Sequence, residues 1–268
     1  MAEDAPSGVP SNEIVHRIEN GVAWITLNRP DVRNAIAPAH RDRLIELFEE
    51  AGSDDGTRCV VITGNGGSFC SGADLRGSSG SASESVADVI RKGAQRLIAS
   101  VIDCPKPVIA GVDGVAAGIG AHLALACDLV VATERARFIE VFVRRALVPD
   151  GGGAYLLVRL IGPQKAKELI FFGGDVHAQD AHEMGLVNCV VPVDDLESVL
   201  REWAERLAAG PTKTISLAKK LINGAHDVDR ATAFEAEALA QEENMTTEDA
   251  QEGVRSFVER REPNFKGR

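Results

Sequence analysis

A chain of 268 residues, 44% hydrophobic and 26% charged, is long enough for one large buried core and has the composition of an ordinary globular protein. The formal net charge of −11 argues against a nucleic-acid partner, which would require a basic surface, but still allows anionic ligands held by a few local cations. Because the sequence has no run of 18 apolar residues, we expect no membrane-spanning segment.

The first segment, residues 1–12, is acidic and rich in Pro, Gly and Ser, and it resembles neither a signal peptide nor a transit peptide. We interpret it as the disordered tail of a cytoplasmic protein. The five cysteines agree with this compartment, because an odd, scattered set without a CxxC pair is typical of reduced thiols rather than of disulfides. The six histidines show no ligand spacing near them, so we expect no metal site.

The N-terminal part of the chain predicts strands and helices in alternation. Residues 13–28 alternate in polarity on both sides of Asn20-Gly21, which is a strong β-hairpin signal. Pro38 fits the first position of an amphipathic helix. The next predictions are a short buried strand at 59–63, a mobile Gly/Ser-rich segment at 77–85, and a helix over 86–103.

The stretch 107–132 is the centre of the predicted structure. It reads as a strand, a glycine-rich turn, a short buried helix and a second strand, with glycines at Gly111, Gly114, Gly118 and Gly120. The first N–H groups of that helix, near Ile119, have no partner within the helix and are free to bind a partly negative oxygen. Such a turn stabilises a developing oxyanion when a second free N–H converges on the same oxygen, so another stretch must supply that donor.

The C-terminal part completes an α/β pattern. Helices are predicted over 152–160 and 164–172 and a strand over 187–191, and from about Asp194 the chain is almost wholly helical. An acidic helix is predicted over 231–244, and Thr246 or Thr247 is a good cap for a final helix. The apolar faces of these helices, for example Val254, Phe257 and Val258, must either fold back on the core or pack between subunits.

Several segments together carry a resemblance to one family. They are LNRPDVRNAI (27–36), VVITGNGGSFCSGADL (60–75), the central stretch ending in Cys127-Asp128, LVPDGGGAYLLVRLIG (147–162), AQDAHEMGLVNCVVP (178–192) and EGVRSFVERREPNF (252–265). In this order and spacing, the chain resembles the crotonase (enoyl-CoA hydratase/isomerase) superfamily over nearly its whole length.

The resemblance implies an α/β fold in which a crotonase-like spiral of ββα units over 13–193 holds the acyl-CoA site. It also implies a C-terminal helical trimerisation region over 194–268, and hence a homotrimer or a dimer of trimers. The ligand it implies is a coenzyme A thioester, with no cofactor beyond the coenzyme A that the substrate carries.

The resemblance also assigns residues to the site. In the family two backbone N–H groups hold the thioester oxygen, and these fall on Ala73 and Ile119. Neighbouring positions expected to contact the substrate are Ser71, Gly72, Leu75, Gly118 and Phe142. Arg33, after the NRP turn, is a further candidate for ligand binding. Phe265 and Lys266 resemble a family tail that covers the adenine and phosphates, sometimes from a neighbouring subunit.

The acid–base residues of hydration are absent at the positions where the family carries them. Hydration needs two carboxylates that hold one water and move its protons, and the two glutamates of family hydratases correspond to His122 and Phe142. A slipped alignment could bring in Glu140, although the anchors Phe138 and Pro149 argue against the slip. His122 could act as an acid or base, or it could simply donate to a backbone carbonyl.

Asp150 remains as the candidate proton carrier. Family members that shift double bonds, and aryl-CoA dehalogenases, place their working carboxylate at this position. Moving a double bond needs one base, whereas dehalogenation needs one carboxylate nucleophile. The structural alternative is that Asp150 only caps the following helix. The neighbouring Arg144 and Arg145 either bind ligand phosphates or pair with Glu140 at the surface.

The sequence therefore favours an enzyme that stabilises a thioester enolate and isomerises an unsaturated acyl-CoA. One alternative is enoyl-CoA hydration with His122 or Glu140 and a water. A second alternative is a CoA-thioester-binding protein with little catalysis, which the missing glutamates motivate.

Overall fold

The computed structural model describes residues 9–76 and 85–268. The predicted mobile segment 77–85 lies outside the described residues except for Ser85, and so does the predicted tail except for residues 9–12. Within that tail, Val9 is only 2% exposed and belongs to the main hydrophobic core.

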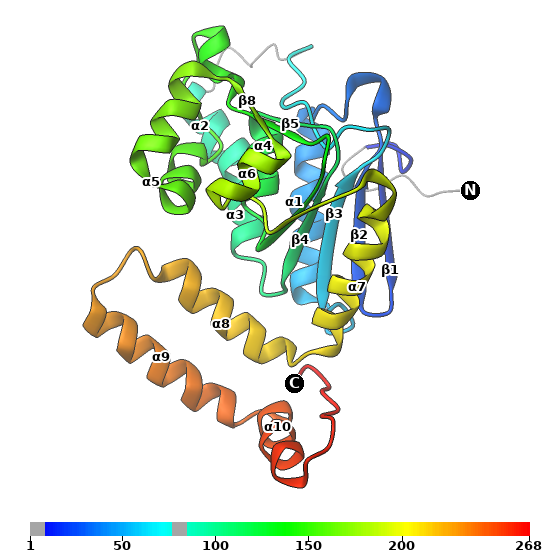
Figure 1. Cartoon of the computed structure of the whole chain (residues 1–268), viewed down its shortest axis with the longest axis vertical. Helices are drawn as coiled ribbons and strands as arrows, with labels where there is room; N and C mark the ends of the chain where they lie inside the picture. The colour runs from blue at the N-terminus through cyan, green and yellow to red at the C-terminus, as the bar shows by residue number, and fades with distance from the viewer. Residues whose placement is uncertain (1–8, 77–84) are drawn as a thin grey trace.

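A six-stranded sheet forms the centre of the molecule, in the order β1-β2-β3-β4-β6-β9 (Figure 1). β1 and β2 are antiparallel, as the Asn20-Gly21 signal predicted, and both turn residues have positive φ. The remaining neighbours are parallel, which explains why β3 and β4 consist almost entirely of buried residues. The bounds are Ile14–Glu19, Val22–Leu27, Cys59–Gly64, Val108–Val112, Leu129–Thr133 and Cys189–Val191.

A second, three-stranded sheet continues from the first and was not predicted as a separate unit. Its strands, in the order β5-β7-β8, are Val115–Ala117, Arg137–Ile139 and Asp175–His177. The chain passes from β4 into β5 at Gly114, whose φ is 61°. A Cβ at Gly114 would lie 2.1 Å from the Gly67 carbonyl oxygen, so the loop after β3 requires glycine there. This turn carries the central stretch from the large sheet to the small one.

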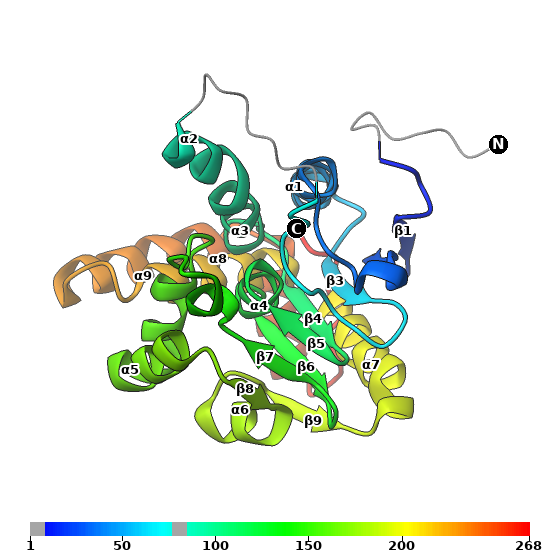
Figure 2. The same cartoon turned by 90° about the horizontal axis from the view of Figure 1, so that it is seen from above.

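Helices cover one face of the large sheet (Figure 2). They are α1 (Pro38–Ser53), α3 (Arg96–Ile102) and α4 (Ile119–Leu125), while α2 (Val86–Ile90) lies farther out, beyond α3 (Figure 2). The predicted helix over 86–103 is interrupted by a π-helical turn, Arg91–Gln95, which separates α2 from α3. α4 is buried along its whole length, as the glycine-flanked apolar pattern predicted.

The two helices predicted over 152–160 and 164–172 correspond to α5, Gly153–Phe172. Gly162 has non-helical backbone angles and precedes Pro163, so α5 is broken where the prediction separated them. α6, Ala178–Met184, connects the small sheet to β9.

α7, Leu196–Ala209, covers the opposite face of the large sheet. Its Leu200 and Ala204 are buried against Ile109 and other strand residues. A Cβ at Gly111 in β4 would lie 2.4 Å from a methyl carbon of Leu200, so the small residue allows close helix–sheet packing. The first helix of the predicted helical region 194–268 is therefore part of the sheet's own packing.

The last three helices extend away from the sheet (Figure 1). They are α8 (Thr212–Gly224), α9 (Arg230–Met245) and α10 (Glu248–Glu259). Thr247 caps α10, because its side chain accepts a hydrogen bond from the Ala250 amide. Large apolar side chains on α9 and α10 remain exposed in the single chain: Phe234, Leu239, Met245, Val254, Phe257 and Val258.

The described residues also bear on membrane insertion and on the state of the cysteines. Within residues 9–76 and 85–268, no helix combines the length and apolar character needed to cross a bilayer. All five cysteines fall within these residues and are free thiols, four of them buried.

Candidate functional site

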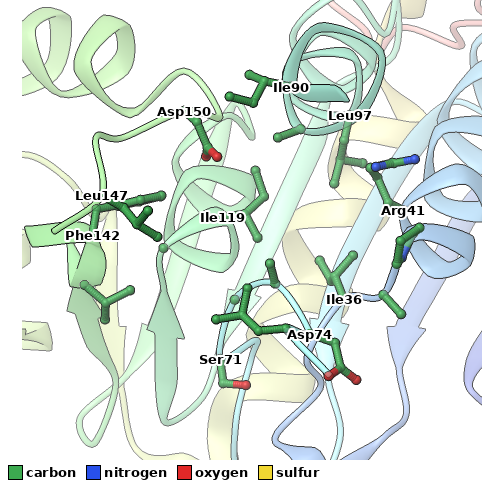
Figure 3. A pocket seen from close by; sticks show the side chains of 18 of the residues that line it. Ile36, Arg41, Ser71, Asp74, Ile90, Leu97, Ile119, Phe142, Leu147 and Asp150 are labelled. Carbon is green, nitrogen blue, oxygen red and sulfur yellow. The ribbon is translucent and has the colours of Figure 1, made fainter. Parts of the chain in front are cut away.

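A cavity of about 280 Å³ opens where several of these elements meet (Figure 3). Its walls come from the start of α1, the loop after β3, α2 and α3, the start of α4 and the loop before α5. Eight predicted site residues line it: Ser71, Gly72, Ala73, Leu75, Gly118, Ile119, Phe142 and Asp150. Segments far apart in the sequence thus contribute to one cavity.

Strand pairing brings Ala73 and Ile119 together. Cys70 pairs in parallel with Ala116, through the Cys70 amide to the Val115 carbonyl (2.9 Å) and the Ala117 amide to the Cys70 carbonyl (2.9 Å). Ala73 and Ile119 each lie three residues beyond this pair, so the two chains reach the cavity side by side. The two segments can approach this closely because residue 120 is glycine: a Cβ there would lie 2.4 Å from the Cys70 carbonyl oxygen.

The Ala73 amide has no hydrogen-bond acceptor among the described residues. The Ile36 amide donates to the Gly72 carbonyl and the Asp74 amide donates to the Ile36 carbonyl, both at 2.9 Å. Because successive peptide groups of an extended chain face opposite sides, the Ala73 N–H lies on the side away from Ile36.

The Ile119 amide is left free by the turn at Gly118. Gly118 has φ 54° and ψ −125°, a conformation that is strained for other residues. Its amide donates to the Ile139 carbonyl, and its carbonyl accepts from the His122 amide as the first bond of α4. Ile119 is the first residue of α4, so its N–H has no partner within the helix.

Two carboxylates line the cavity, and their surroundings differ. The Asp74 side chain is 7% exposed and accepts hydrogen bonds from Arg76 (2.9 Å from Nε) and from Arg29 (3.3 Å). The bonds from the Arg76 guanidinium, followed by those from Arg29, hold the pKa of Asp74 far below its usual range. Asp74 is therefore an ionised structural group with its oxygens already occupied.

Asp150 has no hydrogen-bond or ion-pair partner among the described residues. The cap of α5 is Gly152, in a left-handed conformation with φ 80°, and no side chain caps this helix. The capping role considered for Asp150 is thus not adopted. Asp150 lines the cavity instead, at its rim in Figure 3, across from Ile119.

The two arginines of the 3-10 helix Val141–Arg145 have different environments. Arg144 donates to the Gly173 carbonyl (2.7 Å) and to the Asp175 carboxylate (2.8 Å). Arg145 lines the cavity, and none of the described residues pairs with it. The pairing with Glu140 that the sequence left open occurs for neither arginine, and Arg145 is available to an anionic ligand group.

His122 and Glu140 lie behind the cavity wall and do not line it. The His122 ring is fully buried, and its Nε2 is 3.1 Å from a carboxylate oxygen of Glu140. The ring stacks on Phe142 with centroids 5.2 Å apart and an interplanar angle of 11°. Phe142 therefore separates the pair from the cavity, and the bond to Glu140 replaces the backbone carbonyl that was considered as the partner of His122.

Comparison with known proteins agrees with this geometry. The family model described as enoyl-CoA hydratase/isomerase matches residues 17–268. The chain belongs to the enoyl-CoA hydratase/isomerase family. Its relatives include a Rhodobacter capsulatus protein named "Probable enoyl-CoA hydratase", 38% identical over 95% of this chain and 98% of the relative. Another is the 1,2-epoxyphenylacetyl-CoA isomerase of Escherichia coli, 35% identical over 95% and 98% of the two chains.

The fold comparison gives the same family. The crystal structure of an enoyl-CoA hydratase from Bacillus anthracis matches with a TM-score of 0.90 and 36% identity, over 96% of this chain and 100% of that one. The predicted crotonase-type α/β fold is therefore confirmed. Acyl-CoA processing is the shared theme of this family, and the relatives' names include both hydratases and isomerases.

Three other predicted ligand contacts of the family site do not line the cavity of the single chain. Arg33 is exposed in a left-handed turn, and its carbonyl accepts from the Ser71 amide. Phe265 and Lys266 belong to the C-terminal segment, which lies at the end of the sheet opposite α2 and α4 in Figure 1. The Asp249 carboxylate holds that segment by accepting from the Lys266 amide at 2.6 Å.

Sequence reasoning missed several cavity residues. Asp74 lies within the SGADL motif but was not singled out, although its neighbours were. The apolar residues of α2, the π-helical turn and α3 that form one wall are Val89, Ile90, Ala94 and Leu97. The structure marks this wall, because Val89 is apolar yet 44% exposed, which is typical of a helix that faces a ligand site; the sequence itself carries no sign of that exposure.

Proposed function

We propose that the protein isomerises an unsaturated acyl-CoA, with the Ala73 and Ile119 amides holding the thioester oxygen and Asp150 carrying the proton. The observation that carries this proposal is that Asp150 is the cavity carboxylate without a partner in the described chain. The other cavity carboxylate, Asp74, is occupied by two arginines and has a strongly lowered pKa, so it is a poor proton acceptor.

The proposed reaction needs only one base. The Asp150 carboxylate removes a proton from C2 of a 3-enoyl thioester, and the electron pair delocalises into the carbonyl to form a dienolate. The two amides stabilise the negative oxygen, each by about 3 kcal/mol in the transition state. Asp150 then returns the proton to C4, so the double bond moves from C3–C4 to C2–C3. Coenzyme A is part of the substrate, and the reaction requires no further cofactor.

Hydration is the alternative, and the position of the His122–Glu140 pair argues against it. A hydratase must hold a water against the reacting carbons with two acid–base groups. His122 and Glu140 are buried behind Phe142, and neither lines the cavity. Because relatives include proteins named as hydratases, the two reactions must be compared directly. A CoA-thioester-binding protein with little catalysis remains the second alternative.

The shape of the cavity supports an apolar acyl group. Val89, Ile90 and Leu97 line one side, and Leu147 and Phe142 line another. Arg145 supplies a cation without a partner in the described chain, suited to an anionic part of the ligand.

The experiment compares isomerisation of trans-3-hexenoyl-CoA with hydration of crotonyl-CoA. We expect wild-type protein to isomerise the first substrate much faster than it hydrates the second. Asp150→Asn should lower kcat for isomerisation by at least about 100-fold, because it removes the base. Asp55→Asn, the same chemical change at an exposed site away from the cavity, is the matched control. Full isomerase activity in Asp150→Asn, or hydration as the faster reaction, would contradict the proposal.

We further propose that α8–α10 form the contacts of a homotrimer or a dimer of trimers. The exposed apolar side chains on α9 and α10 are unusual for a free surface, since Phe257 is 85% and Val258 74% exposed. In such an assembly Phe265 and Lys266, which do not line the cavity of their own chain, would reach the ligand of a neighbouring subunit.

A further inference from the structure

The His122 ring contacts three parts of the cavity wall from behind. On one side it stacks on Phe142, whose other surface lines the cavity. On the helix that carries it, α4, His122 lies one turn after Ile119, the residue whose amide is the proposed oxyanion donor. Its third contact is with the glycine run that follows Asp150, which consists of residues 151–153.

The glycine run is fitted to the ring. A Cβ at Gly153 would lie 2.1 Å from His122 Nε2, and a Cβ at Gly151 would lie 3.2 Å from Nδ1. The same Gly151 Cβ would lie 2.3 Å from a terminal carbon of Ile119. Any side chain in this run would push the ring or the loop aside. The backbone that follows Asp150 therefore packs directly against the His122 imidazole ring.

Glu140 fixes the orientation of that imidazole. Its carboxylate is 3.1 Å from Nε2, and the residue is only 5% exposed. The other ring nitrogen, Nδ1, is buried and has no hydrogen-bond partner among residues 9–76 and 85–268. A core built for stability alone would fill this volume with an apolar side chain, because a buried unpaired polar atom destabilises the folded state. A stacked aromatic ring would occupy the same space, but only the bond to Glu140 fixes the ring's rotation.

We propose that His122 and Glu140 are positioning residues, which hold Asp150 and Phe142 in register with the Ile119 amide. This inference rests on the proposed role of Asp150. The pair does not touch the substrate. It acts by limiting how far the Asp150 loop can move relative to the thioester oxygen, and displacements of about 1 Å can lower a rate about 100-fold.

The central test is the variant Glu140→Ala, assayed with trans-3-hexenoyl-CoA. We expect kcat to fall about 10- to 100-fold while KM changes less than about threefold, because the loop moves but the ligand walls remain. Glu140→Gln keeps an oxygen that can accept from Nε2 and should recover most of the loss. Gly153→Ala displaces the ring from the other side and should reproduce the kcat effect, which keeps the test valid if Glu140→Ala does not fold.

A double-mutant cycle separates positioning from general weakening of the fold. If the pair acts through Asp150, Glu140→Ala should cause no further loss of kcat in the Asp150→Asn background, measured with enzyme in excess. The control is Asp128→Asn, which weakens another ion pair, that of Asp128 with the buried Lys219 at 2.8 Å, away from the cavity. It should lower the melting temperature and leave kcat unchanged in both backgrounds.

The outcomes distinguish this inference from the proposed function. If Asp150→Asn keeps wild-type activity, the proposed role of Asp150 is wrong, and the positioning role that rests on it is wrong as well. If Asp150→Asn is inactive but Glu140→Ala has wild-type kcat, or multiplies the loss in the double variant, the positioning role is wrong and the proposed function stands.

Discussion

Asp74 and Asp150 line one cavity, yet only Asp74 is held by other side chains. Arg76 donates to both carboxylate oxygens of Asp74 at 2.9 Å, and Arg29 adds a longer bond at 3.3 Å. Asp150 has no such bonds within the described part of the chain. This difference supports the proposed role of Asp150, because a carboxylate held by guanidinium groups is a poor proton acceptor.

The bonds to Asp74 make a pH-dependent contribution to stability. Because the pKa of Asp74 is lowered by folding, the unfolded chain binds this proton more readily than the folded protein does. The stabilisation is therefore fully present above the ordinary aspartate pKa of about 4 and is lost as the pH falls below it. Asp74→Asn should be less stable than wild type at pH 7, by at most about 1 kcal/mol because Arg76 is largely exposed.

Denaturant unfolding at pH 7 and at pH 3.5 checks this prediction. The difference between wild type and Asp74→Asn should shrink at the lower pH, since part of the Asp74 contribution is already lost from the wild-type protein. A difference in unfolding free energy between the two proteins that is larger at pH 3.5 than at pH 7 would show that the sign of the pKa shift is wrong.

Only proline removes a backbone N–H, so the test of the Ile119 amide instead disturbs the turn that presents it. Gly118→Ala would place a side chain on a residue with φ 54° and ψ −125°, with its Cβ 3.3 Å from Val141. We expect a loss of about 1–3 kcal/mol in stability and about 100-fold in kcat, as the Ile119 amide shifts. Gly185→Ala is the matched control, because Gly185 also has positive φ but no neighbour within 4 Å of a Cβ.

Calorimetry and steady-state kinetics on both variants separate the two effects. Gly185→Ala should lose stability and retain kcat. If Gly118→Ala loses no more kcat than Gly185→Ala, the Ile119 amide does not contribute to catalysis.

Local signals accounted for much of the fold. The Asn20-Gly21 turn identified the hairpin, because few residue pairs tolerate two positive φ values in succession. The glycine-flanked apolar run identified α4, since a short and largely apolar helix is stable only when buried. The small β5-β7-β8 sheet was not recognised as a separate unit, because three-residue strands carry too little periodicity.

The candidate site was predictable where backbone geometry decides it and not where side-chain packing does. The glycine turn predicted a free amide near Ile119, the resemblance to the family supplied Ala73 as the second donor, and both residues line one cavity. The sequence left Asp150 undecided between a cap and a free carboxylate, because the choice depends on Gly152 taking the cap position. The bond between His122 and Glu140 joins residues 18 positions apart, and no local pattern predicts it.

The buried Lys219 and its partly exposed partner Asp128 should be strongly coupled. The Lys219 ammonium is 8% exposed and also donates to the Val101 and Lys106 carbonyls at 3.2 Å. Burial raises the pKa of Asp128, and the attraction of Lys219 opposes that shift. Asp128→Ala leaves a buried cation without its counter-ion and should cost about 3 kcal/mol.

Adding Lys219→Met to Asp128→Ala should recover most of this loss, because an apolar pair needs no counter-ion. Urea unfolding of the single and double variants measures the recovery. A double variant that is less stable than Asp128→Ala would mean that the Lys219 bonds to the two carbonyls dominate.

The exposed face of α10 provides the last prediction. Phe257 is 85% exposed and Val258 74%, so an aspartate at position 257 removes few contacts within the chain. Phe257→Asp should therefore keep the melting temperature of the dissociated chain but place a desolvated charge in any subunit contact, which costs several kcal/mol. Sedimentation velocity should give a trimer or hexamer for wild type and smaller species for the variant. Ile18→Asp, a like change at a residue of β1 that is 54% exposed, is the control and should assemble normally. A monomeric wild type would contradict the proposed assembly. A Phe257→Asp variant that assembles as wild type does would show that the subunit contact does not include Phe257.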